Sequence, residues 1–248
     1  MELNTYPLVC TRGVVLYPNQ EIVIDVGRDT SVHAVENAQD NYDKKICLFS
    51  QKELEQENPG KEDIYPVGTL CEVRHIRRFD NFLRVKFRGI KRVKLNNWIN
   101  GSLSDLAEVE ILESEKQDAV EEEALIRMIA DELDRMQGQD RFVTKEIVME
   151  ISKGMGGEFL SDKAVQGLPL DLERKQKYLE TLGVNDRLMM LLQDMAKEKK
   201  MSEVEQQINE TVKERIDQGQ KDYYLREKMN VIREELGDTV AQDEDAAK

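Results

Sequence analysis

Up to about residue 115, hydrophobic residues occur in short runs separated by turn residues, which is the pattern of β-strands. The clearest run is 82–88, where Leu83, Val85 and Phe87 share one face and Arg84, Lys86 and Arg88 share the other. Asp80 and Asn81 suit the tight turn before this run. We predict strands at Tyr6–Cys10, Glu21–Val26, Ile46–Phe49, Thr69–Arg78, Phe82–Arg88, Val93–Leu95 and Leu106–Leu112.

The connections in this half predict one helix and several turns. Asp29 or Thr30 is the expected N-cap of a helix with apolar positions at 32, 35 and 38. Residues 17–19 suit a turn, and residues 51–63 are polar enough for a loop. Many short strands, one helix and no βαβ rhythm predict a small, mostly antiparallel barrel or sandwich.

After about residue 115 the hydrophobic period changes to that of helices. Gly183 is the expected stop of the fourth helix, and Asn185 is the expected N-cap of a fifth. The fifth contains no proline and would be roughly 75 Å long at 1.5 Å per residue. The predicted helices are Asp118–Gln137, Phe142–Lys153, Phe159–Gln166, Asp171–Leu182 and Asn185–Leu236.

The apolar residues of the long helix fall into three patches on three different faces, at 188–195, 204–223 and 225–236. A coiled coil would keep one face throughout, so we predict three different surroundings along one helix. A break at Gly219 is the alternative. The predicted class is α+β, with a β domain at 1–115, a helical bundle at 116–183, the long helix at 184–237 and a polar tail at 238–248.

Composition and charge argue against certain classes of ligand and indicate a cellular location. The net charge of −14 argues against general affinity for nucleic acid or anionic membranes. Cys10, Cys47 and Cys71 each lie in an apolar run, where a buried, reduced thiol is expected. The start of the chain lacks the features of a signal peptide, and no apolar run reaches membrane-spanning length. We therefore expect a cytoplasmic protein.

The sequence contains no recognisable active site. It has no phosphate-binding GxxxxGK[ST] motif and no GxSxG motif. Cys71 and His75 lie four apart on a predicted strand, too far apart to share a metal easily. Acidic residues at 121–123 fall in the first turn of a helix, where the helix dipole accounts for them. We therefore assign no catalytic, cofactor-binding or metal-binding residue.

Residues 74–94 form a strongly basic segment within a chain whose net charge is negative. Residues 74–94 hold nine Arg or Lys and a single acidic residue, Asp80. The basic strand face formed by Arg84, Lys86 and Arg88 could grip RNA. We favour the alternative, in which this face is neutralised by acidic groups of the same chain or of another subunit.

Three stretches of the chain form a recognisable set: the opening at 7–18, the segment from Tyr65 to Arg92, and Gln220-x-x-Tyr223-Tyr224-Leu225-x-Glu227 with its continuation to Gly237. Together they resemble the N-terminal region of the Lon family of ATP-dependent proteases. Lys175-Gln176, Leu179-Glu180 and Arg187-Leu188 add to the likeness, which runs from about residue 5 to 237. Asp80-Asn81-Phe82 departs from the family's usual hairpin and Cys10 from its usual apolar residue, without threatening the fold.

The resemblance implies a PUA-like β domain, a helical bundle and a long helix leading to an ATPase module that uses ATP and Mg²⁺. A protease domain with a serine–lysine dyad would follow. We expect the present chain to be an excised or truncated part of such a protein. The resemblance also implies hexamer assembly and capture of unfolded or damaged proteins in protein quality control.

Flexible methionines suit varied substrates, although ordinary packing is the alternative for them. The candidate contacts for substrates or subunits are Met189, Met190, Met195, Met201, Tyr223 and Tyr224. The predicted function is therefore non-catalytic recruitment and subunit contact. The alternatives are an RNA-binding module that uses residues 74–94 and a standalone helical scaffold.

Overall fold

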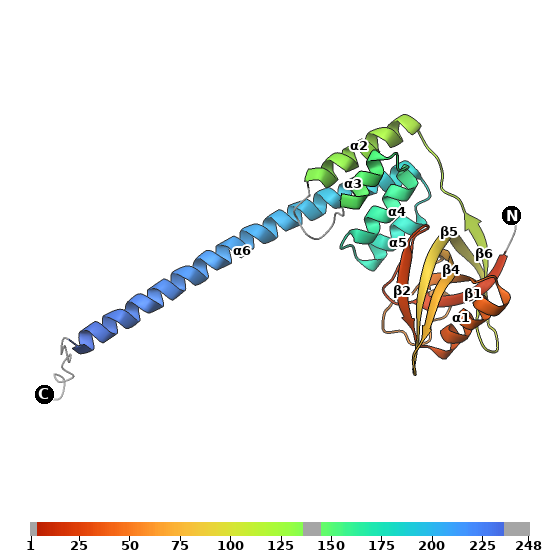
Figure 1. Ribbon diagram of the computed structural model, residues 1–248, viewed down its shortest axis with the longest axis horizontal. Coiled ribbons are helices and arrows are strands. Elements are labelled where there is room, and N and C mark those ends of the chain that lie inside the picture. Colours follow the sequence, from red (N-terminus) through yellow and green to blue (C-terminus); the bar gives the residue numbers. More distant parts are fainter. Residues whose placement is uncertain (1–3, 136–144, 236–248) are drawn as a thin grey trace. The chain divides into compact units, whose positions relative to one another are not determined.

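A single 17-residue strand, β5 (Leu83–Ile99), organises the sheet in the computed structural model, which describes residues 4–135 and 145–235 (Figure 1). One edge of β5 pairs with β4 (Val67–Arg78). The other edge pairs first with β2 (Glu21–Val26) and then with β6 (Leu106–Leu112). β3 (Lys45–Ser50) and β1 (Asn4–Thr11) complete the strand order β2-β5-β4-β3-β1-β6.

The sheet closes on itself because β6 pairs with both β1 and β5. β3, β4, β5, β6 and β1 therefore form a ring, in which only β1 and β3 run parallel. β2 is bound to the part of β5 that β6 does not cover, at residues 83–88. This mixed α+β architecture confirms the predicted fold class.

The barrel is built on strand alternation. Leu83, Val85 and Phe87 point into a buried cluster that is also reached by helix α1 (Asp29–Asn41) through Ala34 and Ala38. The opposite face of the β1–β3–β4 region forms a second buried cluster with β6. Burying two faces of one small sheet accounts for the density of apolar residues before residue 115.

The turn before β2 lies so close to β5 that position 89 must be glycine. Tyr17 O accepts from Gln20 N at 3.2 Å, with Asn19 at φ 61°, which is a type II turn with Pro18 at its second position. Asn19 N donates to Gly89 O and Gly89 N donates to Gln20 O, both at 2.9 Å, which is a G1-type bulge. A Cβ on Gly89 would lie 2.2 Å from Tyr17 O, so only glycine fits under this turn.

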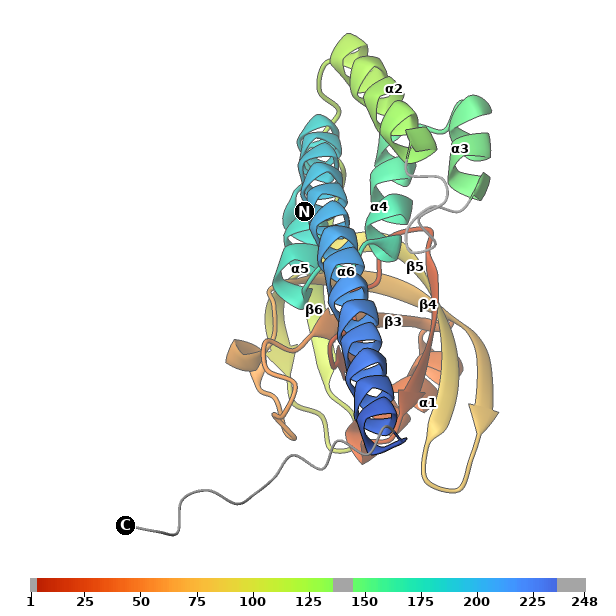
Figure 2. The ribbon, with the colours of Figure 1, turned by 90° about the vertical axis from the view of Figure 1, so that its left-hand side faces the viewer.

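Helices α2 to α5 and the first turns of α6 gather at one end of the barrel (Figures 1 and 2). Their shared core includes Leu125, Leu160, Tyr178 and Leu188 and extends to Tyr17 from the barrel. A short 3-10 helix, η1 (Lys61–Asp63), lies in the loop before β4. The helices are α2 (Ala119–Arg135), α3 (Lys145–Ser152), α4 (Gly157–Gly167), α5 (Leu172–Glu180) and α6 (Val184–Glu235).

Two predicted element boundaries in the sheet region were wrong. The predicted strand Val93–Leu95 is not separate, because β5 continues through a register shift opposite Leu70 and Cys71. The N-cap of α1 is Arg28, without a side-chain cap, rather than Asp29 or Thr30. A bulge lets one strand change direction without ending, and local sequence does not distinguish the two.

Two predicted helix signals near residue 183 were also wrong. α5 ends at Glu180 with Thr181 as its C-cap, and Gly183 forms an isolated β-bridge with Glu115. α6 begins at Val184, so Asn185 lies inside the helix. Its backbone N–H is accepted at 2.8 Å by Oε1 of Gln117, a residue far back in the chain. Tertiary contacts here replace the local capping that sequence patterns predict.

Helix α6 runs without interruption through Gly219, so the alternative of a break there was wrong. The chain divides into two compact units, 1–195 and 196–248, and the boundary falls within α6. The domain limits that we drew at residues 115, 183 and 237 stay predictions. Gln137, Phe142 and the helix end at 236–237 lie outside the described residues, as does the polar tail. In the described ranges, no helix is both long and apolar enough to cross a bilayer.

Candidate functional site: a cleft in the barrel wall and a buried ionic junction

The four candidate methionines have different environments. Met189 is 43 % exposed and Met201 is 51 % exposed, so both are available for contact. Met190 is half-buried against the helical core, and Met195 is fully buried within it. Met195 therefore has the packing role that we weighed as the alternative. Their roles in substrate binding stay predictions.

Tyr223 and Tyr224 are 68 % and 64 % exposed on α6. The patch at 188–195 lies in the helical core, as expected for the first of three surroundings. The later patches expose their large apolar residues by 43–68 %, from Val204 to Ile232. Exposed apolar side chains in a regular array are a feature of contact surfaces, and the partner of these patches stays a prediction.

The basic strand face is largely neutralised within the chain. Both Arg84 Nε and Nη2 donate to the carboxylate of Asp25 at 2.7 Å, and Lys86 Nζ lies 2.6 Å from Glu21. These hydrogen bonds lower the pKa values of both carboxyl groups. Arg88 is exposed opposite Glu72 of β4. Six of the nine basic residues at 74–94 have carboxylate partners, which supports internal neutralisation over RNA binding: Arg74, Arg78, Arg84, Lys86, Lys91 and Arg92.

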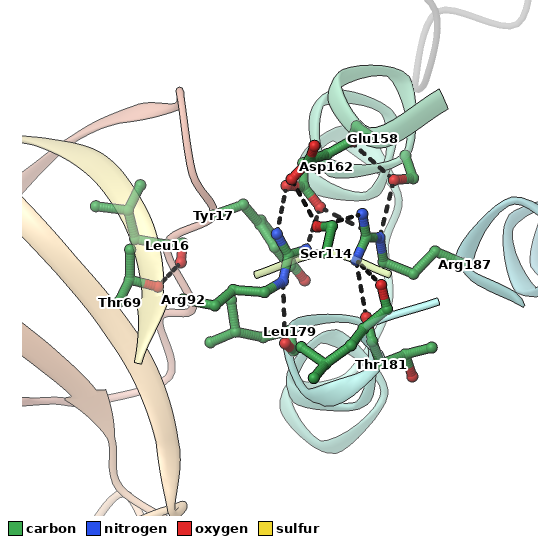
Figure 3. A network of polar contacts seen from close by, with 12 residues as sticks. Leu16, Tyr17, Thr69, Arg92, Ser114, Glu158, Asp162, Leu179, Thr181 and Arg187 are labelled. Atoms are coloured by element: carbon green, nitrogen blue, oxygen red, sulfur yellow. Dashed lines mark hydrogen bonds and ion pairs between the residues drawn. The ribbon is translucent and has the colours of Figure 1, made fainter. Parts of the chain in front are cut away.

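A buried ionic network that the sequence did not reveal joins the barrel to the helices (Figure 3). Arg92 of β5 is 1 % exposed and binds Asp162 of α4 through two hydrogen bonds, at 2.9 and 2.5 Å. Its Nε donates to Leu179 O at 3.1 Å. Burial raises the pKa of the Asp162 carboxyl, and the Arg92 guanidinium opposes that shift.

Arg187 at the start of α6 is the second cation of this network (Figure 3). It is fully buried, and its Nε lies 3.9 Å from Asp162 Oδ1. It donates to Thr181 O at 2.9 Å and to the hydroxyls of Ser161 and Ser114 at 3.2 Å. Burial lowers the pKa of Arg187 to about 10. One carboxylate therefore anchors guanidinium groups from the barrel and from α6.

Three neutral hydrogen bonds reinforce the same region. Tyr17 Oη donates to Lys175 O at 2.7 Å, and Gln176 Nε2 donates to Val67 O at 2.8 Å. Thr69 Oγ1 donates to Leu16 O at 2.5 Å within the barrel (Figure 3). The barrel and the first turns of α6 are therefore parts of one packed body, which is consistent with the first compact unit.

A cleft of about 310 Å³ lies between β1 and β2. Val9, Cys10 and Arg12 line one wall, and Ile24 and Arg28 line the other. Burial raises the pKa of Cys10 to about 12, so its thiol is a poor nucleophile. Among the described residues, no group of His, Cys, Asp and Glu side chains is arranged to hold a metal. The cleft offers a surface for binding, and its one thiol is unsuited to nucleophilic attack.

Arg28 bridges the two walls of this cleft. Its Nη2 donates to Gln51 Oε1 at 2.7 Å and to Gln56 O at 3.1 Å, while Nη1 lies 3.5 Å from Cys10 O. Sequence patterns did not single out this site, because its two walls come from strands that do not pair with each other. The available signal is a basic residue just past the end of each strand: Arg12 directly follows β1, and Arg28 lies two residues after β2.

A comparison with known families matches residues 5–197 to the family described as ATP-dependent protease La (LON) substrate-binding domain. Among curated relatives, the Lon protease of Brevibacillus choshinensis is 33 % identical over 233 residues, covering 94 % of this chain and 30 % of the relative. Lon protease 1 of Bacillus subtilis (strain 168) is 32 % identical over 236 residues, covering 95 % and 30 %. The chain spans about 30 % of the length of these relatives.

Two solved structures share the fold. The N-terminal domain of a Mycobacterium avium complex Lon protease superposes with a TM-score of 0.65 at 17 % identity, covering 78 % of this chain and 98 % of that one. A Lon N-terminal domain protein from Xanthomonas campestris gives 0.53 at 17 % identity, covering 76 % and 97 %.

Proposed function

The chain belongs to the Lon family, whose substrate-binding domain it matches over residues 5–197, and we propose that it recruits unfolded or damaged proteins to an ATP-dependent serine protease. The family match is the observation that carries this proposal. Recruitment is a binding task, and the cleft and the exposed apolar residues provide surfaces for it.

The surface of the first unit supports binding of unfolded chains. Unfolded proteins expose apolar side chains, which are buried most readily against other exposed apolar groups. Met128 and Met149 are both 57 % exposed, and methionine adapts to differently shaped partners. Other large apolar side chains that are more than half exposed on this unit are Val23, Leu54, Leu103 and Val120.

The remaining parts of the proposal concern the whole protein. We place an ATPase module that uses ATP and Mg²⁺, and a protease with a serine–lysine dyad, in the longer protein of which this chain would be a part. We further propose that the chain supports assembly into hexamers in protein quality control. The exposed apolar patches of α6 after residue 195 support subunit contact, because side chains such as Ile208 and Ile216 are more than half exposed. A cytoplasmic location stays a prediction.

Binding of the 248-residue chain to a labelled unfolded protein tests recruitment. Fluorescence anisotropy would compare the binding of casein, which is natively unfolded, with the binding of a folded protein of similar size and charge. We expect saturable binding of casein and none of the folded control. The absence of casein binding at concentrations up to the millimolar range would reject recruitment by this chain.

A further inference from the structure

Between β1 and β2 the described strands of the barrel wall do not pair with each other. At one end of the barrel, β6 lies between β1 and β5 and pairs with both. At the other end, β5 pairs with β2, and β1 pairs only with β3 over Leu8–Thr11. The cleft lies between these two unpaired edges. The cleft therefore lies where a further strand would find unpaired backbone groups in the barrel wall.

The backbone of β2 presents hydrogen-bonding groups to the cleft. Gly89 N donates to Gln20 O, which fixes the phase of the antiparallel ladder between β2 and β5. Since paired residues alternate along such a ladder, Ile22 and Ile24 direct their backbone groups to β5. Val23 and Asp25 then direct theirs away from β5, towards the unpaired edge. An extended peptide supplies the matching N–H and C=O groups.

The opposite wall has the same property. Gln51 N donates to Thr11 O at 2.9 Å, so the backbone of Thr11 faces β3. Cys10, the neighbouring residue, faces the other way. The 3.5 Å contact of Cys10 O with Arg28 Nη1 agrees with this direction, since Arg28 lines the same cleft. Since Cys10 O already accepts from Arg28, the free backbone groups of the cleft are those on the edge of β2.

The charge of the cleft identifies a preferred ligand. Arg12 and Arg28 both line it, and among the described residues neither has a carboxylate within ion-pair distance. Their hydrogen bonds go to neutral acceptors such as Gln56 O. Asp25, the acidic residue in the lining, is already bound by Arg84. Burial lowers the pKa of Arg28 and Glu57 opposes that shift from a distance, but no carboxylate contacts Arg28 among the described residues. Two guanidinium groups without a carboxylate in contact attract a carboxylate and bind it strongly.

We propose that this cleft binds an extended segment of an unfolded protein, which adds as a strand to the open edge of β2 and places an acidic side chain against Arg12 and Arg28. The inference rests on the proposed recruitment function and names the class of segment recognised. Main-chain pairing explains tolerance of varied sequences, because every residue except proline carries the same backbone groups. The guanidinium pair adds a preference for aspartate or glutamate.

The probe is a fluorescent ten-residue peptide of alternating valine and serine with one central aspartate and an amidated C-terminus. Strand addition uses the N–H groups of alternate peptide residues. N-methylation at positions of one parity is therefore expected to weaken binding at least tenfold, and at the other parity to have less than a twofold effect. Equal effects at both parities, or none at either, would overturn strand addition.

The charge preference is tested on the protein and the peptide together. Arg12→Gln is expected to weaken binding about tenfold, as is replacing the peptide's aspartate by asparagine, and the two changes combined should cost little more than either alone. Arg127→Gln, which alters an exposed arginine on α2, is the matched control and should leave binding unchanged. Melting curves would verify that both variants fold. Additive losses, or an equal loss in the control, would overturn the assignment of Arg12.

Casein binding by the same preparations separates this inference from the function on which it rests. If casein binds while the peptide does not bind, or binds without the parity effect, the cleft assignment is wrong and recruitment occurs elsewhere on the chain. If neither binds, the recruitment function fails and the cleft assignment fails with it.

Discussion

Replacing Asp162 by asparagine is expected to destabilise the first unit strongly, because this carboxylate is the shared counter-charge of two buried guanidinium groups. Arg92 and Arg187 are 1 % and 0 % exposed, and Asp162 is 2 % exposed. Asparagine preserves the shape of the side chain but removes its charge. The variant would keep two buried cations without the carboxylate that contacts both, which is the costly way to break a buried ion pair.

The magnitude follows from this burial. Removing one partner of a buried, hydrogen-bonded ion pair costs about 3–5 kcal/mol of folding free energy. For a unit of 150–250 residues, each kcal/mol lowers the melting temperature by about 2–4 °C, which gives a decrease of about 6–20 °C. By contrast, Glu123→Gln removes an exposed ion pair with Arg127 on α2, and it should cost no more than about 0.5 kcal/mol.

Urea unfolding followed by circular dichroism measures both variants against the wild-type chain. Arg92→Met completes a double-mutant cycle with Asp162→Asn, and the double variant should lose less than the sum of the two single losses, because the two residues contact each other directly. If Asp162→Asn stayed within about 1 kcal/mol of wild type, the idea that this ion network holds the helices on the barrel would be refuted.

Three further predictions concern other parts of the chain. Burial raises the pKa values of all three thiols. The contribution of each neutral thiol to the free energy of unfolding is therefore fully present below about pH 8.5, and it decreases above that pH by up to about 1.4 kcal/mol per pH unit for each thiol. In urea unfolding under a reductant, Cys47→Ala should start less stable at pH 8 but lose less than wild type between pH 8 and pH 10; an equal loss would contradict this assignment. Gly89→Ala should cost about 1–3 kcal/mol, because its Cβ would lie 2.2 Å from Tyr17 O, and a melting temperature equal to wild type would show that the turn can move aside. Tyr223→Ala and Tyr224→Ala should each change stability by less than about 0.5 kcal/mol, since both rings are exposed, yet slow ATP-driven degradation by the full-length protease; unchanged degradation would make the pair ordinary surface residues.

Much of the secondary structure could be read from local patterns. The limits predicted for Glu21–Val26 and Leu106–Leu112 match those of β2 and β6, and the turn at residues 17–19 is present. The alternation of Leu83, Val85 and Phe87 correctly identified the buried face of β5. These features depend on interactions between residues that are close in sequence, or on the burial of one face, and both leave a periodic record in the chain.

The candidate sites were less accessible to such patterns. Arg92 has the same strand parity as Arg84 and Arg88, which are exposed on the outer face of β5. Only the packing of α4 and α5 against this part of the barrel buries Arg92, and its partner Asp162 lies 70 residues later in the chain. The cleft between β1 and β2 likewise depends on two strands that do not pair. The hydrophobic periodicity of either strand therefore does not predict it.

Local sequence patterns were enough to predict the α+β class, the alternating strands before residue 115, the helical second half and the resemblance to the Lon family. These properties follow from local periodicity and from motifs carried by neighbouring residues. Three features emerge only from the packing of distant segments: β6 pairs with β5 next to β2 and closes the barrel, Arg92 and Arg187 share Asp162, and an open strand edge lies next to Arg12 and Arg28. Each of these arises where distant segments compete for the same backbone edge or the same buried charge, and that competition is settled only when the chain is packed.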